Sequence, residues 1–94
     1  MFKSADKMMQ ELGFEKLEGD DTESRYGACY QRTNEKYHYV QRLDILHKAS
    51  GSHLIQSYVE GTNSDDFNNC VGLTYKEMKA AMKKYRELKR KYRW

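Results

Sequence analysis

The chain has 94 residues, of which 17 are Lys or Arg, 14 are Asp or Glu, and only 38% are hydrophobic. A chain this short forms a single domain, 1–94, because it cannot bury two separate cores. No hydrophobic run reaches the roughly 18 to 20 residues that span a bilayer, and the N-terminus lacks the apolar segment of a secretory signal. Two cysteines, Cys29 and Cys70, are too few for the disulfide framework of a small secreted domain. We therefore expect a cytoplasmic protein that does not contact a membrane.

The first predicted element is a short helix over residues 4–12. Ser4 can cap its N-terminus, because its hydroxyl can accept a hydrogen bond from a free backbone N–H of the first turn. Gly13 can end the helix, since glycine tolerates the left-handed conformation found there. A first strand is expected over 14–18, followed by an acidic turn over 19–23.

Alternating hydrophobic and polar side chains predict two further strands, over 25–32 and 37–48, joined by a turn at 33–36. The odd-numbered face of the second strand is the more apolar one and contains Tyr39, Gln41, Leu43 and Ile45. The even-numbered face is expected to lie in water and contains Arg42, Asp44 and Lys48. A sheet with one buried face follows from this alternation.

A turn at 49–52 joins this strand to a predicted strand over 53–60, and Gly51 can supply the positive φ of the turn. The hydrophobic pattern favours a register in which Lys48 pairs with His53. This pairing places four hydrophobic side chains on one face: Leu43, Ile45, Leu54 and Tyr58. Pattern and turn length agree, which is what specifies the register of a hairpin.

A polar loop over 61–72 leads to the last element, a helix over 75–94. The expected hydrophobic anchors of the loop are Phe67 and Val71. Thr74 and Glu77 have the spacing of a capping box, in which the hydroxyl and the carboxylate each accept from the other residue's backbone N–H. Leu73 and Met78 are placed as a hydrophobic staple. The fold class is therefore α+β, in the order α-β-β-β-β-α, with a four-stranded antiparallel sheet and a long basic C-terminal helix.

Charge is distributed unevenly along the chain. The last 21 residues carry nine Lys or Arg and two Glu, whereas the preceding 73 carry eight basic and twelve acidic residues. Within the C-terminal helix the apolar side chains recur at helical spacing and are expected to anchor the helix to the sheet. They are Tyr75, Met78, Ala81, Met82, Tyr85, Leu88 and Tyr92.

A second stripe beside the apolar one is purely basic, and it is the candidate partner-binding surface. Its members are Lys76, Lys79, Lys83, Arg86 and Arg90, supported by Lys84, Lys89, Lys91 and Arg93. Tyr85 and Tyr92 could add aromatic contacts to a partner. Trp94 is either a clamp on the fold or an exposed contact residue.

No pattern in the chain indicates catalysis. The chain has no nucleophile elbow, no phosphate-binding loop and no zinc-protease motif. Among the three histidines, the predicted register turns His47 and His53 to different faces, and His38 lies far along the strand. We therefore expect no enzyme, no metal site and no cofactor.

Two functions remain compatible with the sequence. In the first, the protein docks on nucleic acid or a nucleoprotein through the basic helix. In the second, it is a protein-interaction module or an inhibitor of a larger protein, binding an acidic or nucleic-acid-binding site.

Three segments, FKSADKMMQELGFEKLE, LDILHKASGSHLIQSY and NNCVGLTYKEMKAAMKK, resemble small uncharacterised proteins of phages and prophages in Gram-positive bacteria. The resemblance covers most of residues 2–84 and leaves out the basic end. It implies a phage-type accessory protein in the bacterial host cytoplasm, with interference in host defence as one possible task, and it assigns no catalytic residue.

Overall fold

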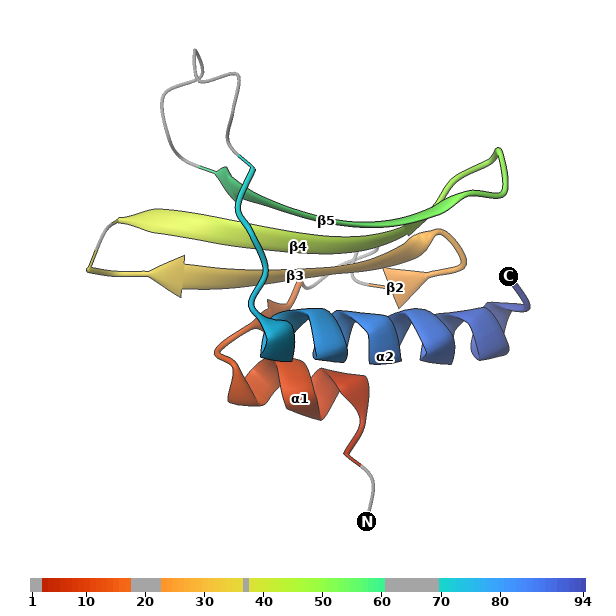
Figure 1. The fold of residues 1–94 in the computed structure, drawn as a ribbon, viewed down its shortest axis with the longest axis horizontal. Helices are drawn as coiled ribbons and strands as arrows, with labels where there is room; N and C mark the ends of the chain where they lie inside the picture. The colour runs from red at the N-terminus through yellow and green to blue at the C-terminus, as the bar shows by residue number, and fades with distance from the viewer. Residues whose placement is uncertain (1–2, 18–22, 37, 61–69) are drawn as a thin grey trace.

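The computed structural model describes residues 3–17, 23–36, 38–60 and 70–94. Two helices cover one face of an antiparallel sheet (Figure 1). The elements are α1 (Ala5–Glu11), β1 (Glu15–Lys16), β2 (Glu23–Ser24), β3 (Gly27–Asn34), β4 (Tyr39–His47), β5 (His53–Glu60) and α2 (Tyr75–Tyr92). The predicted α+β class, with a short N-terminal and a long C-terminal helix, is confirmed.

Helix α1 begins and ends where its sequence predicts. Ser4 caps it, because its Oγ accepts a hydrogen bond from the backbone N–H of Lys7 at 3.1 Å. Gly13 follows the helix with a φ of +91°, the left-handed conformation expected after a helix end. Ala5 and Met9 are fully buried and attach the helix to the core.

The predicted first strand over 14–18 is present as β1, and an unpredicted short strand, β2, follows it; both pair with the same edge of β3. Glu15 of β1 lies opposite Gln31, and Glu23 of β2 lies opposite Ala28. Glu23 therefore belongs to a strand and not to the predicted acidic turn, whose other residues lie outside the described part of the chain. The four-stranded sheet that the sequence predicts thus becomes a five-stranded one.

Strands β3 and β4 form the centre of the sheet. Their ladder runs as far as the pair Asn34 and Tyr39, so β3 continues two residues into the predicted turn at 33–36. Gln41, Leu43 and Ile45 are buried on the helix-covered face, as the alternation predicts. The expectation that Asp44 lies in water is wrong: it is 6% exposed and accepts a hydrogen bond from Gln56 at 3.0 Å.

The hairpin between β4 and β5 has a different register from the predicted one. His47, and not Lys48, pairs with His53, and a backbone hydrogen bond from Lys48 N to Ser52 O closes the loop. A shift of one residue turns every side chain of a strand to its other face. Ile55 and Ser57 therefore lie opposite Ile45 and Leu43 on the covered face. The prediction that Leu54 and Tyr58 lie on that face is wrong.

The segment before α2 rejoins the sheet at β5. Cys70 forms an isolated bridge with Tyr58, and the N–H of Val71 donates to the carbonyl of Ser57 at 3.1 Å. Val71 is half-buried, in keeping with its predicted role as an anchor. Phe67, the other predicted anchor, lies outside the described residues.

Helix α2 begins with the predicted capping box. Thr74 Oγ1 accepts from the N–H of Glu77 at 3.2 Å, and Glu77 Oε1 accepts from the N–H of Thr74 at 2.9 Å. The predicted staple is only half present, because Leu73 packs against the core while Met78 is 41% exposed.

The face that α2 buries is rotated away from the predicted apolar stripe. The buried side chains are Glu77, Ala80, Ala81, Lys84 and Leu88. Three members of the predicted stripe are instead exposed: Tyr75, Met78 and Met82. The two alanines occupy little space, so the helix can lie close to the sheet, and carboxylates and an arginine on neighbouring elements accommodate the two charged residues.

A set of polar contacts made by the half-buried Arg32 holds the start of α2 to the sheet. Arg32 donates to Glu77 Oε2 at 2.6 Å, to Gln41 Oε1 at 2.7 Å and to the carbonyl of Leu12 at 2.9 Å. Its guanidinium also lies 4.3 Å from the centre of the Phe14 ring. One side chain thus links β3, β4, α2 and the end of α1. Neither of the helices in the described residues is long and apolar enough to cross a membrane.

Candidate interaction surface

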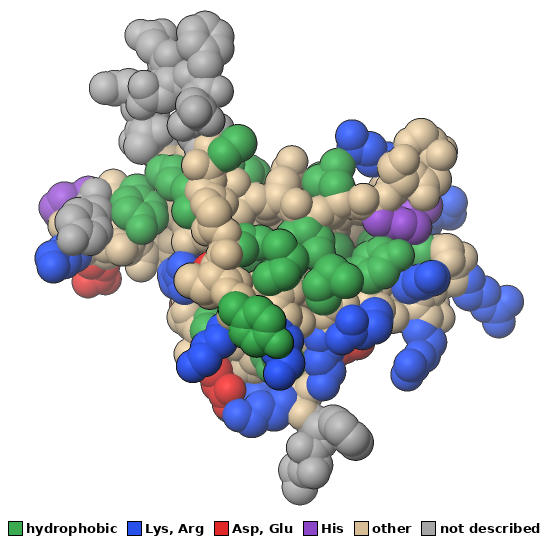
Figure 2. All heavy atoms as spheres, viewed as in Figure 1, with side chains coloured by type: hydrophobic (Ala, Val, Ile, Leu, Met, Phe, Trp, Pro, Cys, Tyr) green, Lys and Arg blue, Asp and Glu red, His purple; other side chains and the backbone are tan. Residues whose placement is uncertain are grey.

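Most of the basic side chains of α2 lie on its outer side, away from the sheet. We call the following group the basic face: Lys76, Lys79, Lys83, Arg86, Lys89, Arg90 and Arg93. All are exposed except Lys83, which is half-buried. Figure 2 shows Lys and Arg side chains along this side of the helix, below a central group of hydrophobic side chains. The helix geometry therefore aligns the cations that are scattered in the sequence.

Within the described residues, the basic face is largely without internal counter-charges. No carboxylate there lies within ion-pair distance of Lys76, Lys79, Arg86 or Arg90, nor of Lys89 or Arg93. One acidic side chain of α2, Glu87, lies beside the row, and its Oε2 accepts from the backbone N–H of Ala5 at 2.9 Å. The other, Glu77, is buried against Arg32. Several like charges therefore lie side by side along one helix face.

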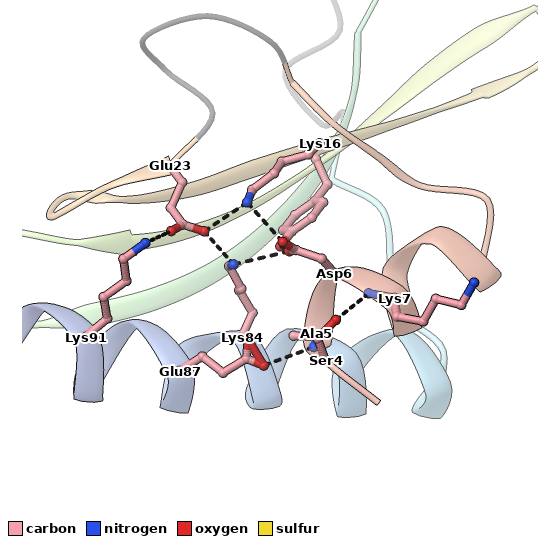
Figure 3. Close-up of polar contacts among 10 residues, drawn as sticks. Ser4, Ala5, Asp6, Lys7, Lys16, Glu23, Lys84, Glu87 and Lys91 are labelled. Atoms are coloured by element: carbon pink, nitrogen blue, oxygen red, sulfur yellow. Dashed lines mark hydrogen bonds and ion pairs between the residues drawn. The ribbon is translucent and has the colours of Figure 1, made fainter. Parts of the chain in front are cut away.

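Two predicted members of the surface do not belong to it. Lys84 is 4% exposed and lies between α2 and the sheet, with its Nζ 2.5 Å from Glu23 and 3.1 Å from Asp6. Lys91 is paired with Glu23 at 2.7 Å. Figure 3 shows both ammonium groups turned toward Glu23. The prediction that Lys84 extends the exposed positive surface is therefore wrong, whereas Lys91 stays exposed and is paired with Glu23.

These contacts form one ionic cluster, which we define as Asp6, Lys16, Glu23, Lys84 and Lys91, with Tyr30 donating its hydroxyl proton to Asp6. Burial alone would raise the pKa of Glu23, but hydrogen bonds from Lys84, Lys91 and Lys16 outweigh it and lower that pKa to about 2. The pKa of Asp6 is lowered in the same way against the effect of burial, by Tyr30, Lys16 and Lys84.

The aromatic residues at the end of α2 pack on the protein itself. Trp94 stacks on His47 and His53, with ring centres 5.0 and 4.9 Å away, and its Nε1 donates to the carbonyl of Arg25 at 2.8 Å. Tyr85 and Tyr92, the other proposed contact residues, are half-buried against the core. Of the two interpretations left open for Trp94, the structure favours the clamp.

The stacked histidines correct another prediction. His47 and His53 lie on the same face, directly opposite each other, with ring centres 4.8 Å apart. Burial, followed by the effects of His47 and Lys89, lowers the pKa of His53. No group of three or more metal-ligating side chains occurs in the described ranges of the chain.

A hydrophobic surface that the sequence did not predict borders the basic face. Tyr75 is 79% exposed, Met78 41% and Met82 38%. Together with β5, Met78 and Met82 line a shallow groove that we call the β5–α2 groove; its lining is His53, Leu54, Ile55, Met78, Met82 and Tyr85. The sequence signal was the apolar stripe itself, which is wider than the sheet can cover.

Comparison of the chain with models of protein families, with curated proteins and with solved structures found no match in any of the three. The expected relationship to phage proteins therefore stays a prediction. What can be argued about function rests on the geometry of the two surfaces.

Proposed function

We propose that the protein is a non-enzymatic binding protein that docks on nucleic acid, free or within a nucleoprotein, through the basic face of α2. The observation that supports this proposal most is the set of exposed cations of the basic face that have no ion-pair partner in the described residues: Lys76, Lys79, Arg86, Lys89, Arg90 and Arg93. An 18-residue helix extends about 27 Å, at about 1.5 Å per residue. A phosphate backbone presents negative charge over such a length, and its condensed counterions are released when cations replace them.

The chemistry of the face favours contacts to phosphates. Lysine donates as a point charge, and arginine can bind a phosphate through two parallel hydrogen bonds. The ionic cluster supports the proposal, because it places two carboxylates, Asp6 and Glu23, against the inner side of α2 and leaves the outer side positive. We expect binding with little base specificity and a strong dependence on salt.

The proposal is tested with a short fluorescein-labelled oligonucleotide whose anisotropy is followed as protein is added. The triple variant Lys79→Glu, Lys83→Glu and Arg86→Glu is expected to lose measurable binding while its circular dichroism stays unchanged. A matched control reverses three exposed lysines elsewhere, Lys7, Lys36 and Lys48, and so changes the net charge equally. Equal losses in both triple variants, or no binding by the wild type, would contradict the proposal.

A second candidate function is favoured by the exposed Tyr75, Met78 and Met82 beside the basic face. Here the partner is a protein, bound at an acidic or nucleic-acid-binding site, and inhibition of a host defence protein is one form of this activity. Capture of partners from lysate with and without nuclease separates the two. Partners lost after nuclease treatment support nucleic-acid docking, whereas a stoichiometric protein that remains supports the second function.

A further inference from the structure

The β5–α2 groove combines an apolar lining with an open strand edge. Met78, Met82 and Tyr85 line it from the helix, and Ile55 and Leu54 line it from β5. Its volume is about 440 Å³. Figure 2 shows hydrophobic side chains gathered where the sheet meets α2. Flexible, polarizable methionine side chains adapt to varied apolar partners, so such a surface is suited to binding.

Strand β5 pairs with β4 on one side, and within the described residues it makes only an isolated bridge, between Tyr58 and Cys70, on the other. On the other side, Val71 donates to the carbonyl of Ser57, which fixes the direction in which Ser57 presents its backbone groups. Alternate residues of a strand present N–H and C=O to the same edge. Ile55 and His53 therefore direct their backbone groups to this edge, and within the described residues no other strand pairs with them there.

The charge around the groove restricts what can occupy it. No lining residue is acidic. Lys89 interacts electrostatically with His53 at one end of the groove, and Arg86 and Lys79 are exposed on the next row of α2. A second copy of this chain, paired edge to edge along β5, would bring its own cations close to those of the first copy, and the two copies would repel each other. An acidic occupant is complementary.

We propose that the β5–α2 groove binds an extended segment of a partner protein, with alternating apolar and acidic residues, as an additional strand on the edge of β5. This inference goes beyond nucleic-acid docking and does not depend on it. Main-chain hydrogen bonds to His53 and Ile55 supply affinity, and alternate side chains supply specificity. Apolar side chains of the segment enter the groove. The acidic ones, on the opposite face of the added strand, give the segment the net negative charge that the cations around the groove attract at longer range.

The spacing of the two elements fits this arrangement. Figure 1 shows β5 running roughly along α2. Side chains on one face of a strand repeat at about 6.6 Å, while residues four apart on a helix repeat at about 6 Å. Two successive groove-facing side chains of the segment therefore meet Met78 and Met82 in turn.

The test uses a blocked synthetic peptide of alternating Val and Glu, titrated into isotope-labelled protein and followed by NMR. Two further peptides carry N-methyl groups, one on every Val and one on every Glu. A strand presents only one of these two sets of N–H groups to β5, so one methylated peptide is expected to bind at least about tenfold more weakly, and the other about as well as the parent. Equal affinity of both methylated peptides, or no saturable binding of the parent, would overturn the proposal.

Protein variants locate the site. Met78→Gln with Met82→Gln keeps length and charge, and since both residues are exposed we expect the double variant to fold. The double variant is expected to bind the Val–Glu peptide at least about tenfold more weakly than the wild type does. Its affinity for the oligonucleotide is expected to equal that of the wild type. Unchanged peptide affinity in this variant would contradict the groove as the site. If the protein binds the peptide but not the oligonucleotide, only the nucleic-acid proposal is contradicted. The two proposals are therefore tested independently.

Discussion

Lys84 Nζ lies 2.5 Å from Glu23 Oε1, beneath the sheet and almost out of contact with water. The contact joins the middle of α2 to the short strand β2, which is far from it in sequence. It also brings a carboxylate of the acidic N-terminal part of the chain against the basic C-terminal helix. Carboxylates from the N-terminal half neutralise the inner side of α2, and the cations on the outer side are left for a partner.

Replacing Lys84 by Met is expected to destabilise the protein by about 3 kcal/mol, because removing one member of a buried ion pair leaves the other without full compensation. Glu23 keeps its contacts with Lys16 and Lys91, so the expected loss of stability is at the lower end of the range for broken buried ion pairs. The free energy of unfolding in urea measures the effect. Lys79→Met is the matched control, and it should change that free energy by less than about 0.5 kcal/mol. Equal effects of the two changes would show that the cluster contributes no more than a surface charge.

Acid should destabilise the fold through the same cluster. The pKa of Glu23 falls from its ordinary value of 4.5 to about 2 in the folded protein, so the unfolded chain takes up a proton first as pH decreases. The stability that Glu23 contributes is therefore present above about pH 4.5 and is lost on the way to about pH 2, by on the order of 2 kcal/mol. Urea unfolding at a series of pH values measures it. Glu23→Gln should flatten the dependence over this range, and an unchanged slope would rule out Glu23 as its source.

Trp94 is expected to stabilise the fold. Trp94→Ala removes its stacking on two histidines and its hydrogen bond to Arg25, at a cost of about 1 to 2 kcal/mol in the free energy of unfolding. Trp94→Phe keeps an aromatic ring and should fall between the wild type and Ala. Oligonucleotide affinity should stay the same in both variants. Loss of affinity without loss of stability would instead make Trp94 a contact residue.

Two glycines with positive φ should respond differently to alanine. At Gly27, with φ +141°, an added Cβ would lie 2.0 Å from the carbonyl oxygen of Ile45. We expect Gly27→Ala to cost about 3 kcal/mol or more, since backbone must move. At Gly51, with φ +90°, nothing lies within 4 Å, so only the backbone strain of about 1 kcal/mol applies. Thermal unfolding compares the two variants, and similar melting temperatures would contradict this difference.

The sequence predicted the helices well because their ends carry local signals. The Ser4 cap, the glycine after α1 and the capping box of Thr74 and Glu77 act within a few residues, so no tertiary information is needed. The two central strands could also be predicted, because the alternation of hydrophobic and polar side chains is a local signal as well.

The register of β5 could not be obtained in this way. Apolar residues occur at both parities of this strand, at Leu54 and Tyr58 as well as at Ile55 and Val59. The choice depends on contacts made across the sheet, such as the hydrogen bond from Gln41 Nε2 to Ser57 Oγ at 2.8 Å. A hydrophobicity pattern treats Ser57 as polar and so favours a register that places Ser57 in water.

The candidate site was predicted in part. Periodicity aligned the outer cations correctly, but it assigned every lysine of α2 to solvent. The burial of Lys84 depends on Asp6 and Glu23, which only the fold brings together. The same rotation of the helix exposes Met78 and Met82, so the hydrophobic groove could not be foreseen from the helix alone.

The most direct test of the central claim is the salt dependence of oligonucleotide binding. The logarithm of the association constant, plotted against the logarithm of salt concentration, should fall linearly for the wild type. Arg86→Ala and Lys79→Ala should each reduce the slope by about 1, as expected when one phosphate contact is lost. Lys84→Ala should leave the slope of the folded protein unchanged, because Lys84 is buried. A wild-type affinity that does not depend on salt, or a slope that none of these changes affects, would contradict docking through the basic face.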